Sequence, residues 1–502
     1  MLELTGFVLP DVGILTLTAL AGKTDPAAVT TDDLDRAADY LEDFYSQGVG
    51  KSLAAGMVFP NSGFVQAAFD KPEFHYKRQA WADFVLRGHQ HRDLEPILQA
   101  LDKAEYRAMV LRGFEGAPRC AFTGQPAYLR VSRDMLPMLN GRGIINFGPM
   151  GEAGLPVSDT ILLAIHALPL GCIVTQGALL AVESDDPHLM FELVKANLET
   201  NLRFINLASQ NGYDKFPNLS SYKTRLIDVL VGAFRAQDMR WGDDFHTPSL
   251  NAYHFSNYGS NARVTIYALP SSTVQFVWEA SKDEHAASWG QIVQRGWTAD
   301  KPEEEELKQK APKLTQRNLI YEDLFELPEN ARAFLRTYFL RRPLQKFKND
   351  PRGQYNLFAE SDLVSWDLTA LFLRRIMNME KSRIEHISAL GTRLADYIQT
   401  LDRRRLLQAL YRGGSYSNFR ITLIRAIQDY ARHFPPDSEP LVSLEGYVKI
   451  FEEGDGFERS DWNLARDLLL IRIFEVLHRS GYLSQTARDL QADDEAEETV
   501  AS

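Results

Sequence analysis

The sequence predicts an α+β protein with a mixed N-terminal body and an all-helical C-terminal bundle. Three observations support this: helical and strand-like apolar patterns mix in the first half, Gly and Pro punctuate one stretch, and helical spacing dominates the last third. We expect an N-terminal body over residues 1–345 with a loop-rich insert at about 116–177, a C-terminal helical bundle over 346–490, and an acidic, disordered tail over 491–502.

The N-terminal body contains one clear helix and two expected strands. Asp32 and Asp33 form an acidic first helical turn, and apolar residues then recur at steps of three and four up to Tyr45. Residues 264–267 and 274–277 are rich in β-branched and aromatic residues, and a Leu-Pro-Ser-Ser turn separates them. We therefore expect a helix near the start of the body and two strands near its end.

The C-terminal bundle begins after a Pro- and Gly-containing break at residues 348–353. Ser361 or Asp362 can cap a first helix, and a second helix carries apolar residues at helical spacing from residue 384 to 401. Residues 463–477 are apolar nearly all round, which is typical of a buried helix. We expect an antiparallel bundle of about four or five helices.

The composition is that of an ordinary globular chain. Of 502 residues, 45% are hydrophobic and 24% charged, and the net charge of −12 argues against uniform coating of nucleic acid without excluding a local basic face. Two cysteines, Cys120 and Cys172, are too few for a disulfide-stapled module. No signal peptide is recognisable, and the most apolar stretch, residues 161–174, is too short to span a membrane. We expect a cytoplasmic protein with no membrane partner.

No group of residues predicts a convincing catalytic site. His75, His89 and His91 lie close in sequence and are the best candidates for a nuclease-type metal site. However, His89 and His91 would point in different directions on a helix, and no nearby acidic cluster completes a ligand set. We predict a protein that is not an enzyme, and a metal-dependent nuclease is the alternative from a different class.

Positive charge concentrates between residues 371 and 435, where twelve Lys or Arg face five acidic residues. Eleven of the twelve are Arg, whose planar guanidinium suits phosphate oxygens. Solvated helix faces also collect Arg, so that alternative stays open. Candidates for holding a single DNA strand are Arg403, Arg404, Arg405 and Arg412, of which the last two share one helix face by their spacing. Three aromatic residues lie among them and could stack on unpaired bases, although core packing is the favoured explanation for the last: Tyr411, Tyr416 and Phe419.

Three stretches of sequence resemble one family. They are residues 4–23 (LTGFVLPDVGILTLTALAGK), the Phe59-Pro-Asn-Ser segment, and residues 251–261 (NAYHFSNYGSN) followed by 266–271 (IYALPS). The first resembles the opening of the large subunit of type I-B CRISPR Cascade, the Cas-eight group of the CXXC–CXXC type. The second is similar to that family's "PNS" segment, and the third to its "YHFTNxGxxP … YxLPS" signature. The resemblance covers roughly residues 4–280.

The stretch from residue 119 to 171 resembles the family's zinc-binding insert, but its cysteine pairs are degenerate. The first pair reads Cys120 and Thr123, and the window of the second, residues 156–160, contains no Cys. With at most one thiolate left, a closed tetrahedral zinc site cannot form. We therefore expect a degenerate zinc-finger-like insert held by packing, with neither zinc nor another cofactor bound.

The resemblance implies a non-catalytic subunit of an RNA-guided surveillance complex in antiviral defence. Such a subunit recognises the protospacer-adjacent motif in double-stranded target DNA, aids duplex opening and holds the displaced strand of the R-loop. The implied partners are guide RNA with backbone and Cas-five-type subunits, and a separate helicase–nuclease. The alternative within the family is a transposon-associated type I-B effector, in which transposition proteins replace the nuclease and the complex directs insertion.

Two sets of residues follow from the resemblance as candidate sites. The set expected to read the DNA motif is Lys51, Asn61, Ser62 and Gln66, although Asn61 is explained equally well as a turn residue after Pro60. The set that carries the family signature, in DNA binding or more simply in a buried hydrogen-bond network, is His254, Asn257 and Asn261.

Met377 and Met379 precede the basic helical segment. Type I-B systems often lack a separate small-subunit gene and make that protein from within the large-subunit reading frame. We therefore expect that translation can restart at or somewhat upstream of these methionines and yield a small-subunit partner. The alternative is that both methionines simply fill a helix surface.

Overall fold

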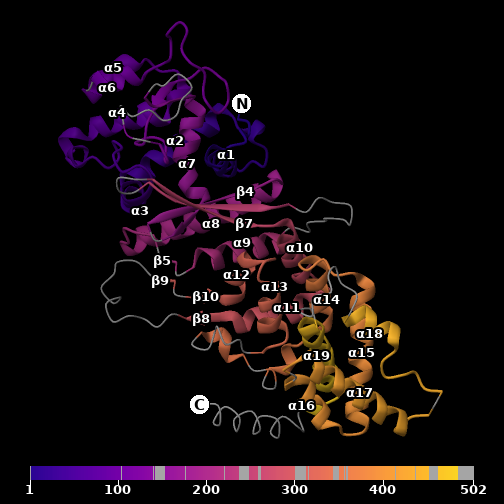
Figure 1. Ribbon diagram of the computed structural model, residues 1–502. Coiled ribbons are helices and arrows are strands. Elements are labelled where there is room, and N and C mark those ends of the chain that lie inside the picture. Colours follow the sequence, from indigo (N-terminus) through magenta and orange to yellow (C-terminus); the bar gives the residue numbers. More distant parts are fainter. Residues whose placement is uncertain are drawn as a thin grey trace. The chain divides into compact units, whose positions relative to one another are not determined.

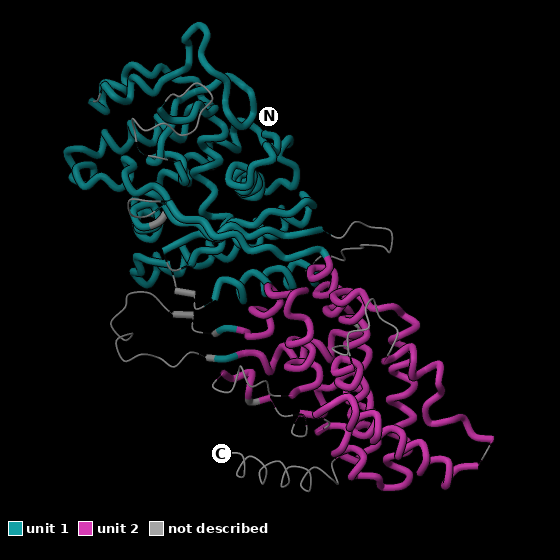
Figure 2. Tube along the Cα trace, viewed as in Figure 1, with its two compact units in different colours: residues 1–271, 298–317 teal, residues 272–297, 318–502 magenta. Residues whose placement is uncertain are grey.

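The structure is a computed structural model, and the residues it describes are 2–102, 104–139, 141, 153–175, 177–216, 218–219, 221–236, 248–257, 262–299, 313–314, 316–342, 350–355, 357, 360–412, 414–435, 437–451 and 462–483. The chain forms two compact units (Figure 2). Unit 1 comprises Met1–Ser271 with Thr298–Arg317, and unit 2 comprises Ser272–Trp297 with Asn318–Ser502. The predicted α+β class is confirmed, with a helical C-terminal region. The predicted tail, residues 491–502, lies outside the described residues.

Unit 1 combines helices with a central sheet (Figure 1). Its helices are α1 Val8–Leu20, α2 Thr31–Ser46, α3 Gly48–Leu53, α4 His75–Leu86, α5 Leu94–Leu101, α6 Ala104–Met109, α7 Asp159–Gly171, α8 Pro187–Asn211 and α9 Tyr222–Ala236. Its main strands are β1 Leu129–Val131, β2 Leu155–Val157, β3 Ile173–Thr175, β4 Ala178–Ser184, β6 Leu250–Ser256 and β7 Arg263–Leu269. Shorter strands are β5 Asn218–Leu219, β8 Trp297–Ala299, β9 Lys313–Leu314 and β10 Gln316–Asn318.

The central sheet is antiparallel, with the strand order β3-β4-β6-β7. Leu179 pairs with Phe255 in the register of β4 and β6, and both side chains join a hydrophobic core with α1, α7 and α8. On the opposite face His254 stacks on Tyr222, which begins α9. Helices therefore pack against both faces of the sheet, whereas the edge strand β7 is largely exposed.

Helices α1 and α7 form the centre of the unit 1 core. They approach closely because Gly13 has no side chain: a Cβ there would lie 2.1 Å from the carbonyl oxygen of Ala164. Helix α7 is buried along nearly its whole length, including Pro169 within it. The expected insert at 116–177 is therefore not loop-rich throughout, because its second half contains this core helix and strand β3.

Helix α2 confirms the helix that the sequence predicts near the N-terminus. The Thr30 hydroxyl accepts from the Asp33 backbone amide, and the Asp33 carboxylate accepts from the Thr30 backbone amide, which is a capping box. The apolar positions from Leu34 to Tyr45 face the core.

Unit 2 is mainly helical (Figure 1). Its longer helices are α10 Ser271–Ala280, α11 Asp283–Gly296, α14 Trp366–Arg375, α15 Lys381–Thr400, α16 Arg404–Arg412, α17 Tyr416–His433, α18 Leu444–Phe451 and α19 Trp462–Arg479, and two short ones are α12 Leu319–Asp323 and α13 Ala331–Phe334. Helix α19 is buried on all sides and packs along α15, as its apolar composition predicts.

Two expectations for this region are corrected by the structure. Residues 274–277 are part of helix α10 and not a strand, because residues after Pro270 start a helix whose apolar side chains face the unit 2 core. The boundary expected between 345 and 346 differs from the observed division, since residues 318–342 belong to unit 2. The reason is packing: the Phe334 ring of α13 stacks on Phe372 of α14 at 5.3 Å.

Within the described parts of the chain, no helix combines the length and the apolar character that crossing a membrane requires.

Candidate nucleic-acid interface

Nine of the eleven arginines of residues 371–435 fall into two groups in the structure. The other two are Arg374, which is exposed in α14, and Arg383, which donates to the carbonyl of Ile450. Those of the first group form ion pairs with acidic side chains of unit 2. The closest nitrogen–oxygen distances are 2.6 Å for Arg375 and Glu279, 3.6 Å for Arg393 and Glu439, 2.6 Å for Arg403 and Asp429, and 3.0 Å for Arg404 and Asp402. Their charge is balanced locally, which lowers their contribution to a phosphate-binding surface.

Arg403 is part of a small network between α15, α16 and α17. The Tyr397 hydroxyl of α15 donates to the Asp429 carboxylate of α17, and Arg403 forms its ion pair with the same carboxylate. The hydrogen bond from Tyr397 is the main cause that lowers the pKa of Asp429, and the charge of Arg403 contributes further. Arg403 therefore ties helices together, and the prediction that it holds a DNA strand is not favoured by this contact.

The second group of arginines is exposed on α16 and α17. Arg405 and Arg412 of α16 are both exposed, as the prediction of a shared helix face requires. Arg420, Arg425 and Arg432 of α17 are exposed as well, and the structure gives them no ion pair with any acidic residue that it describes.

Helix α17 presents a continuous outward surface, which we call the α17 face and define as Arg420, Ile421, Ile424, Arg425, Gln428 and Arg432. The side opposite to it is buried through Phe419, Leu423 and Ala426. Ile421 is 46% and Ile424 44% exposed, so apolar side chains lie between the arginines. The single acidic residue of α17, Asp429, is engaged by Tyr397 and Arg403. The face is therefore basic with an apolar centre.

The spacing of the α17 face suits a polyanion. Arg425 and Arg432 are seven residues apart, which places them on one side of the helix with a rise of about 10 Å between them. Successive phosphates of one strand advance by about 3.4 Å in a duplex, so the two guanidiniums match phosphates about three nucleotides apart. Arginine also binds phosphate oxygens in a bidentate manner.

The aromatic residues expected to stack on bases pack inside unit 2. Phe419 is buried against Phe451 and Trp462, with ring centroids at 5.4 and 5.8 Å. Tyr411 and Tyr416 are half-buried, and the Tyr416 hydroxyl is hydrogen-bonded to that of Tyr447 at 2.6 Å. The candidate interface therefore consists of arginine and isoleucine side chains and does not include these rings.

The candidate motif-reading residues lie around a loop of unit 1, residues 59–66. The amide of Ser62 donates to the carbonyl of Phe59 at 3.0 Å, which forms a turn with Pro60 and Asn61 at its centre. Asn61 is exposed at the tip, whereas Ser62 is completely buried and cannot reach a nucleic acid in this structure. Ser62 is therefore removed from the predicted contact set.

The other two members of this set have different surroundings. Lys51 lies in α3 and is ion-paired with Asp70, which also binds Arg78. Gln66 is half-buried and precedes a short helical turn at Ala67–Asp70. Asn61 is thus the most accessible of the four, and Lys51 has its charge partly compensated.

One signature residue, Asn257, holds the backbone next to this loop. The Asn257 side chain is completely buried, and its amide donates to the carbonyls of Val58 at 2.8 Å and Arg133 at 3.2 Å. Because Val58 directly precedes the loop, Asn257 fixes one end of it. This contact supports the structural alternative for Asn257.

His254 also has a structural environment. Its Nε2 is 3.0 Å from the Thr175 hydroxyl, and its ring stacks on Tyr222 at 4.4 Å. Burial lowers the pKa of this imidazole, so the neutral form is favoured. Asn261, the third signature residue, lies outside the described residues.

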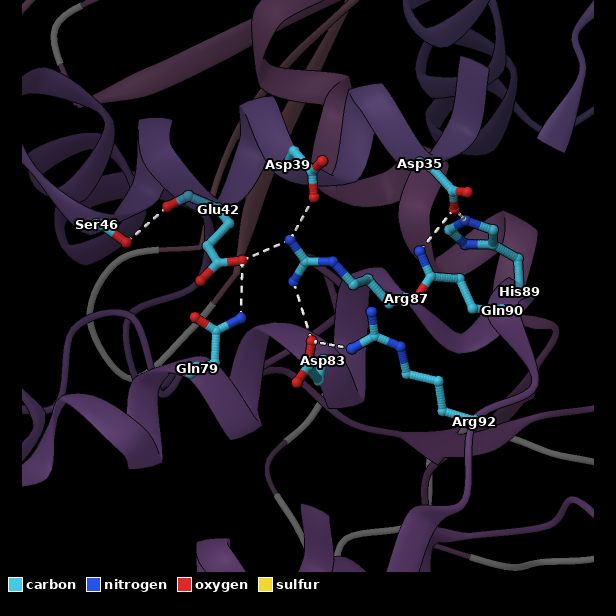
Figure 3. Close-up of polar contacts among 10 residues, drawn as sticks. All are labelled: Asp35, Asp39, Glu42, Ser46, Gln79, Asp83, Arg87, His89, Gln90 and Arg92. Atoms are coloured by element: carbon cyan, nitrogen blue, oxygen red, sulfur yellow. Dashed lines mark hydrogen bonds and ion pairs between the residues drawn. The ribbon is translucent and has the colours of Figure 1, made fainter. Parts of the chain in front are cut away.

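A dense polar network connects α2 and α4 (Figure 3). The Arg87 guanidinium is 7% exposed and lies within 2.6 Å of Asp39, 2.6 Å of Glu42 and 3.1 Å of Asp83. Arg92 adds a second cation 2.9 Å from Asp83. Two arginines therefore compensate most of the charge of the three carboxylates, and the cluster ties the two helices together.

The histidines of the nuclease alternative are not brought together as a ligand set. The Nε2 of His89 is hydrogen-bonded to Asp35 at 2.7 Å, and Gln90 donates to the same oxygen, which lowers the pKa of Asp35 (Figure 3). His75 and His91 are exposed, at the start of α4 and in a left-handed turn. Among the described residues, no group of three His, Cys, Asp or Glu side chains has a metal-binding arrangement.

Both cysteines, Cys120 and Cys172, are buried. Cys172 follows α7 in the hydrophobic core of unit 1, where burial raises the pKa of its thiol. Its surroundings are therefore those of a packed core residue.

Comparison of the sequence with protein-family models and with curated proteins finds no match, and comparison of the fold with solved structures finds none.

Sequence reasoning located the basic region but missed the α17 face as a unit. The arginines that it singled out include Arg403 and Arg404, which form ion pairs, and it did not single out those of α17. The signal was present: Ile421, Arg425, Gln428 and Arg432 follow one another at steps of three and four, and no acid shares this stripe.

Proposed function

We propose that the chain is a non-catalytic, nucleic-acid-binding large subunit of an RNA-guided type I-B CRISPR effector. In this role the loop at residues 59–66 contacts the protospacer-adjacent motif, and the α17 face with Arg405 and Arg412 holds the displaced DNA strand. Guide RNA, backbone subunits and a Cas-five-type subunit complete the complex, and base pairing supplies the sequence specificity.

The observation that carries the proposal is the α17 face. Three exposed arginines surround exposed isoleucines on a helix whose single acid is engaged elsewhere. Such a surface binds a phosphate backbone without sequence preference, which is what holding a displaced strand requires. The resemblance of residues 4–280 is the reason for proposing this particular complex. The arginines are the reason for proposing that it binds phosphates through the α17 face.

The test is the affinity of the purified chain for single-stranded DNA as a function of salt. Each phosphate contact contributes about 0.7 to the slope of log K against log salt, so Arg420→Gln, Arg425→Gln and Arg432→Gln together lower the slope by about 2. Binding at 0.1 M salt weakens by about 100-fold when each arginine holds one phosphate. Fluorescence anisotropy of a labelled oligonucleotide measures both quantities.

A matched control removes the same charge from unit 1. Arg36, Arg107 and Arg203 are exposed arginines that form ion pairs with Asp33, Glu95 and Glu199. Replacing these three by Gln is expected to leave the slope nearly unchanged. Equal losses in the two triple variants contradict the proposed interface, and metal-dependent DNA cleavage that is lost in His89→Ala contradicts the non-catalytic role.

The proposal includes a small subunit made from the same reading frame. Met377 and Met379 lie in the connection between α14 and α15, so a restart there includes helices α15 to α19 entire. Mass spectrometry of the purified complex is expected to find a C-terminal fragment of roughly 14–17 kDa, on the basis of the ~125 residues that follow these methionines. Absence of this fragment contradicts internal translation.

A further inference from the structure

An acidic segment follows the last described helix of unit 2. After Leu483 the sequence contains Arg488 and six acidic residues, which are Asp489, Asp493, Asp494, Glu495, Glu497 and Glu498. We call residues 489–498 the acidic segment. Its charge is opposite to that of the α17 face, and carboxylates are the side chains that arginine binds best.

The structure describes the chain up to Leu483, six residues before the acidic segment begins. Leu483 is buried, and the hydroxyl of the preceding Tyr482 donates to the Asp402 carboxylate at 2.6 Å. Asp402 lies in the turn between α15 and α16 and also accepts from the Nε of Arg404 at 3.0 Å. The described chain therefore ends, at Leu483, beside a residue that contacts the turn before α16.

This turn is directly connected to α17. Arg403, the neighbour of Asp402, forms its 2.6 Å ion pair with Asp429. Asp429 lies one helical turn from both Arg425 and Arg432, so it borders the α17 face. These contacts connect Tyr482, through the α15–α16 turn, with Asp429 at the edge of the α17 face.

The acidic segment is long enough to cover this surface. Asp489 is six residues beyond Leu483 and Glu498 is fifteen, which permits spans of up to about 20 Å and about 50 Å. Helix α17 has 18 residues and is therefore about 27 Å long. A ligand tethered by so short a stretch has an effective concentration on the order of millimolar.

We propose that the acidic segment binds the α17 face and competes there with the phosphates of a nucleic acid. The proposal deepens the proposed function and rests on it for the identity of the competing ligand. Six carboxylates replace phosphates on Arg420, Arg425 and Arg432, and a nucleic acid must displace them. This competition lowers the affinity for weakly bound, non-specific polyanions. A long single strand still binds, because it contacts more of the surface than the acidic segment does.

One test compares DNA binding with and without the negative charges. A variant in which all six acidic residues are replaced by Asn or Gln keeps the length of the segment. We expect it to bind a short single strand about 10-fold more tightly at 0.1 M salt, given a tethered concentration of about 1 mM and a site affinity of about 0.1 mM. The difference is expected to vanish at high salt, where both contacts are screened.

A control variant changes the net charge equally in unit 1. It carries Asn or Gln at six exposed acidic positions, which are Glu3, Asp32, Asp43, Glu73, Glu115 and Glu199. We expect its affinity to change much less than that of the acidic-segment variant. Equal gains in both variants mean that overall charge and not local competition is responsible, and they overturn the proposal.

A second test needs no nucleic acid. Because Cys120 and Cys172 are buried, a cysteine pair can be introduced as Ala496→Cys with Gln428→Cys at the centre of the α17 face. We expect an intramolecular disulfide on mild oxidation at low salt, and little of it at 1 M salt or with Arg425→Gln and Arg432→Gln.

The control pair is Ala496→Cys with Ser382→Cys. Ser382 lies in the first turn of α15, about 27 Å along that helix from the α15–α16 turn, and is exposed. Cross-linking of both pairs to the same extent, or of neither, overturns the proposal. A disulfide that forms only between two chains, and increases with concentration, shows that the segment of a second copy binds and overturns the tethered contact.

The two tests separate this proposal from the proposed function. A disulfide at residue 428 without measurable DNA binding in any variant leaves the contact standing and contradicts the nucleic-acid role. DNA binding that is lost with the α17 arginines but is indifferent to the acidic residues, with no disulfide at residue 428, leaves the function standing and removes the competing segment.

Discussion

The buried imidazole of His166 is expected to make the stability of unit 1 depend on pH. His166 lies in α7 with no exposed surface, and its ring stacks on Phe59 at 4.5 Å. Its Nδ1 donates to the carbonyl of Leu162 at 2.8 Å. Burial lowers its pKa from 6.5 to about 4, so the folded protein holds this residue neutral. Phe59 is the first residue of the loop that carries Asn61, so this site supports the candidate interface.

The sign and size of the effect follow from the two pKa values. The unfolded chain takes up a proton near pH 6.5, whereas the folded chain does so only near pH 4. Titration of His166 therefore leaves the free energy of unfolding of unit 1 almost unchanged above about pH 6.5. Below that pH the free energy of unfolding decreases as the pH falls toward 4. At pH 5 the shift amounts to about 1.5 pH units, which corresponds to a loss of about 2 kcal/mol.

The substitution His166→Phe removes the titrating group and keeps a ring against Phe59. We expect its free energy of unfolding to be within about 1 kcal/mol of the natural chain at pH 7.5. At pH 5 the variant should gain about 2 kcal/mol relative to the natural chain. The assay is amide exchange of peptides from α7 at rising urea concentration, because these peptides report on unit 1 alone. His188→Ala, at an exposed histidine, is the control. A difference between His166→Phe and the natural chain that does not change with pH refutes the reasoning.

Two further predictions concern the loop at residues 59–66. Asn257→Ala leaves the carbonyls of Val58 and Arg133 without their donor and is expected to destabilise unit 1 by about 2–3 kcal/mol. The same amide-exchange assay measures this loss of stability. The control is Asn211→Ala, at an exposed asparagine. Asn61→Ala should change stability by less than about 0.5 kcal/mol but weaken binding to duplex with the recognised motif more than to duplex without it. Equal weakening on both duplexes removes Asn61 from motif reading.

Local sequence signals predicted the elements that local chemistry determines. Helix α2 has its capping residue, acidic first turn and apolar stripe within one segment, and the structure has this helix at Thr31–Ser46. Helix α19 was expected to be buried because residues 463–477 are apolar on all sides. In both cases residues that are close together in the sequence determine the helix, so the sequence pattern alone predicts it.

Elements whose state depends on distant partners were predicted less well. Residues 274–277 are short, apolar and β-branched or aromatic, which is compatible with either a strand or a buried helix, and packing in unit 2 selects the helix α10. The sequence did not predict helix α7, because Pro169 within it and the glycines near it are typical of loops. Burial against α1 stabilises it, and this contact depends on Gly13, far away in sequence.

The candidate site shows the same limit. Spacing alone placed Arg405 and Arg412 on one face of α16, and both are exposed. Spacing could not reveal that Arg403 is engaged by Asp429, which becomes its neighbour only when α16 and α17 pack together. Likewise, the burial of Ser62 beside an exposed Asn61 depends on tertiary packing of the loop.

The most direct test of the central claim is copurification of the tagged chain with the products of its neighbouring genes, followed by sequencing of any bound RNA. We expect a stable complex that contains a discrete guide RNA and binds complementary DNA without cutting it. A chain that purifies without RNA and partners, or a complex whose DNA binding is unaffected by Arg420→Gln, Arg425→Gln and Arg432→Gln, contradicts the account.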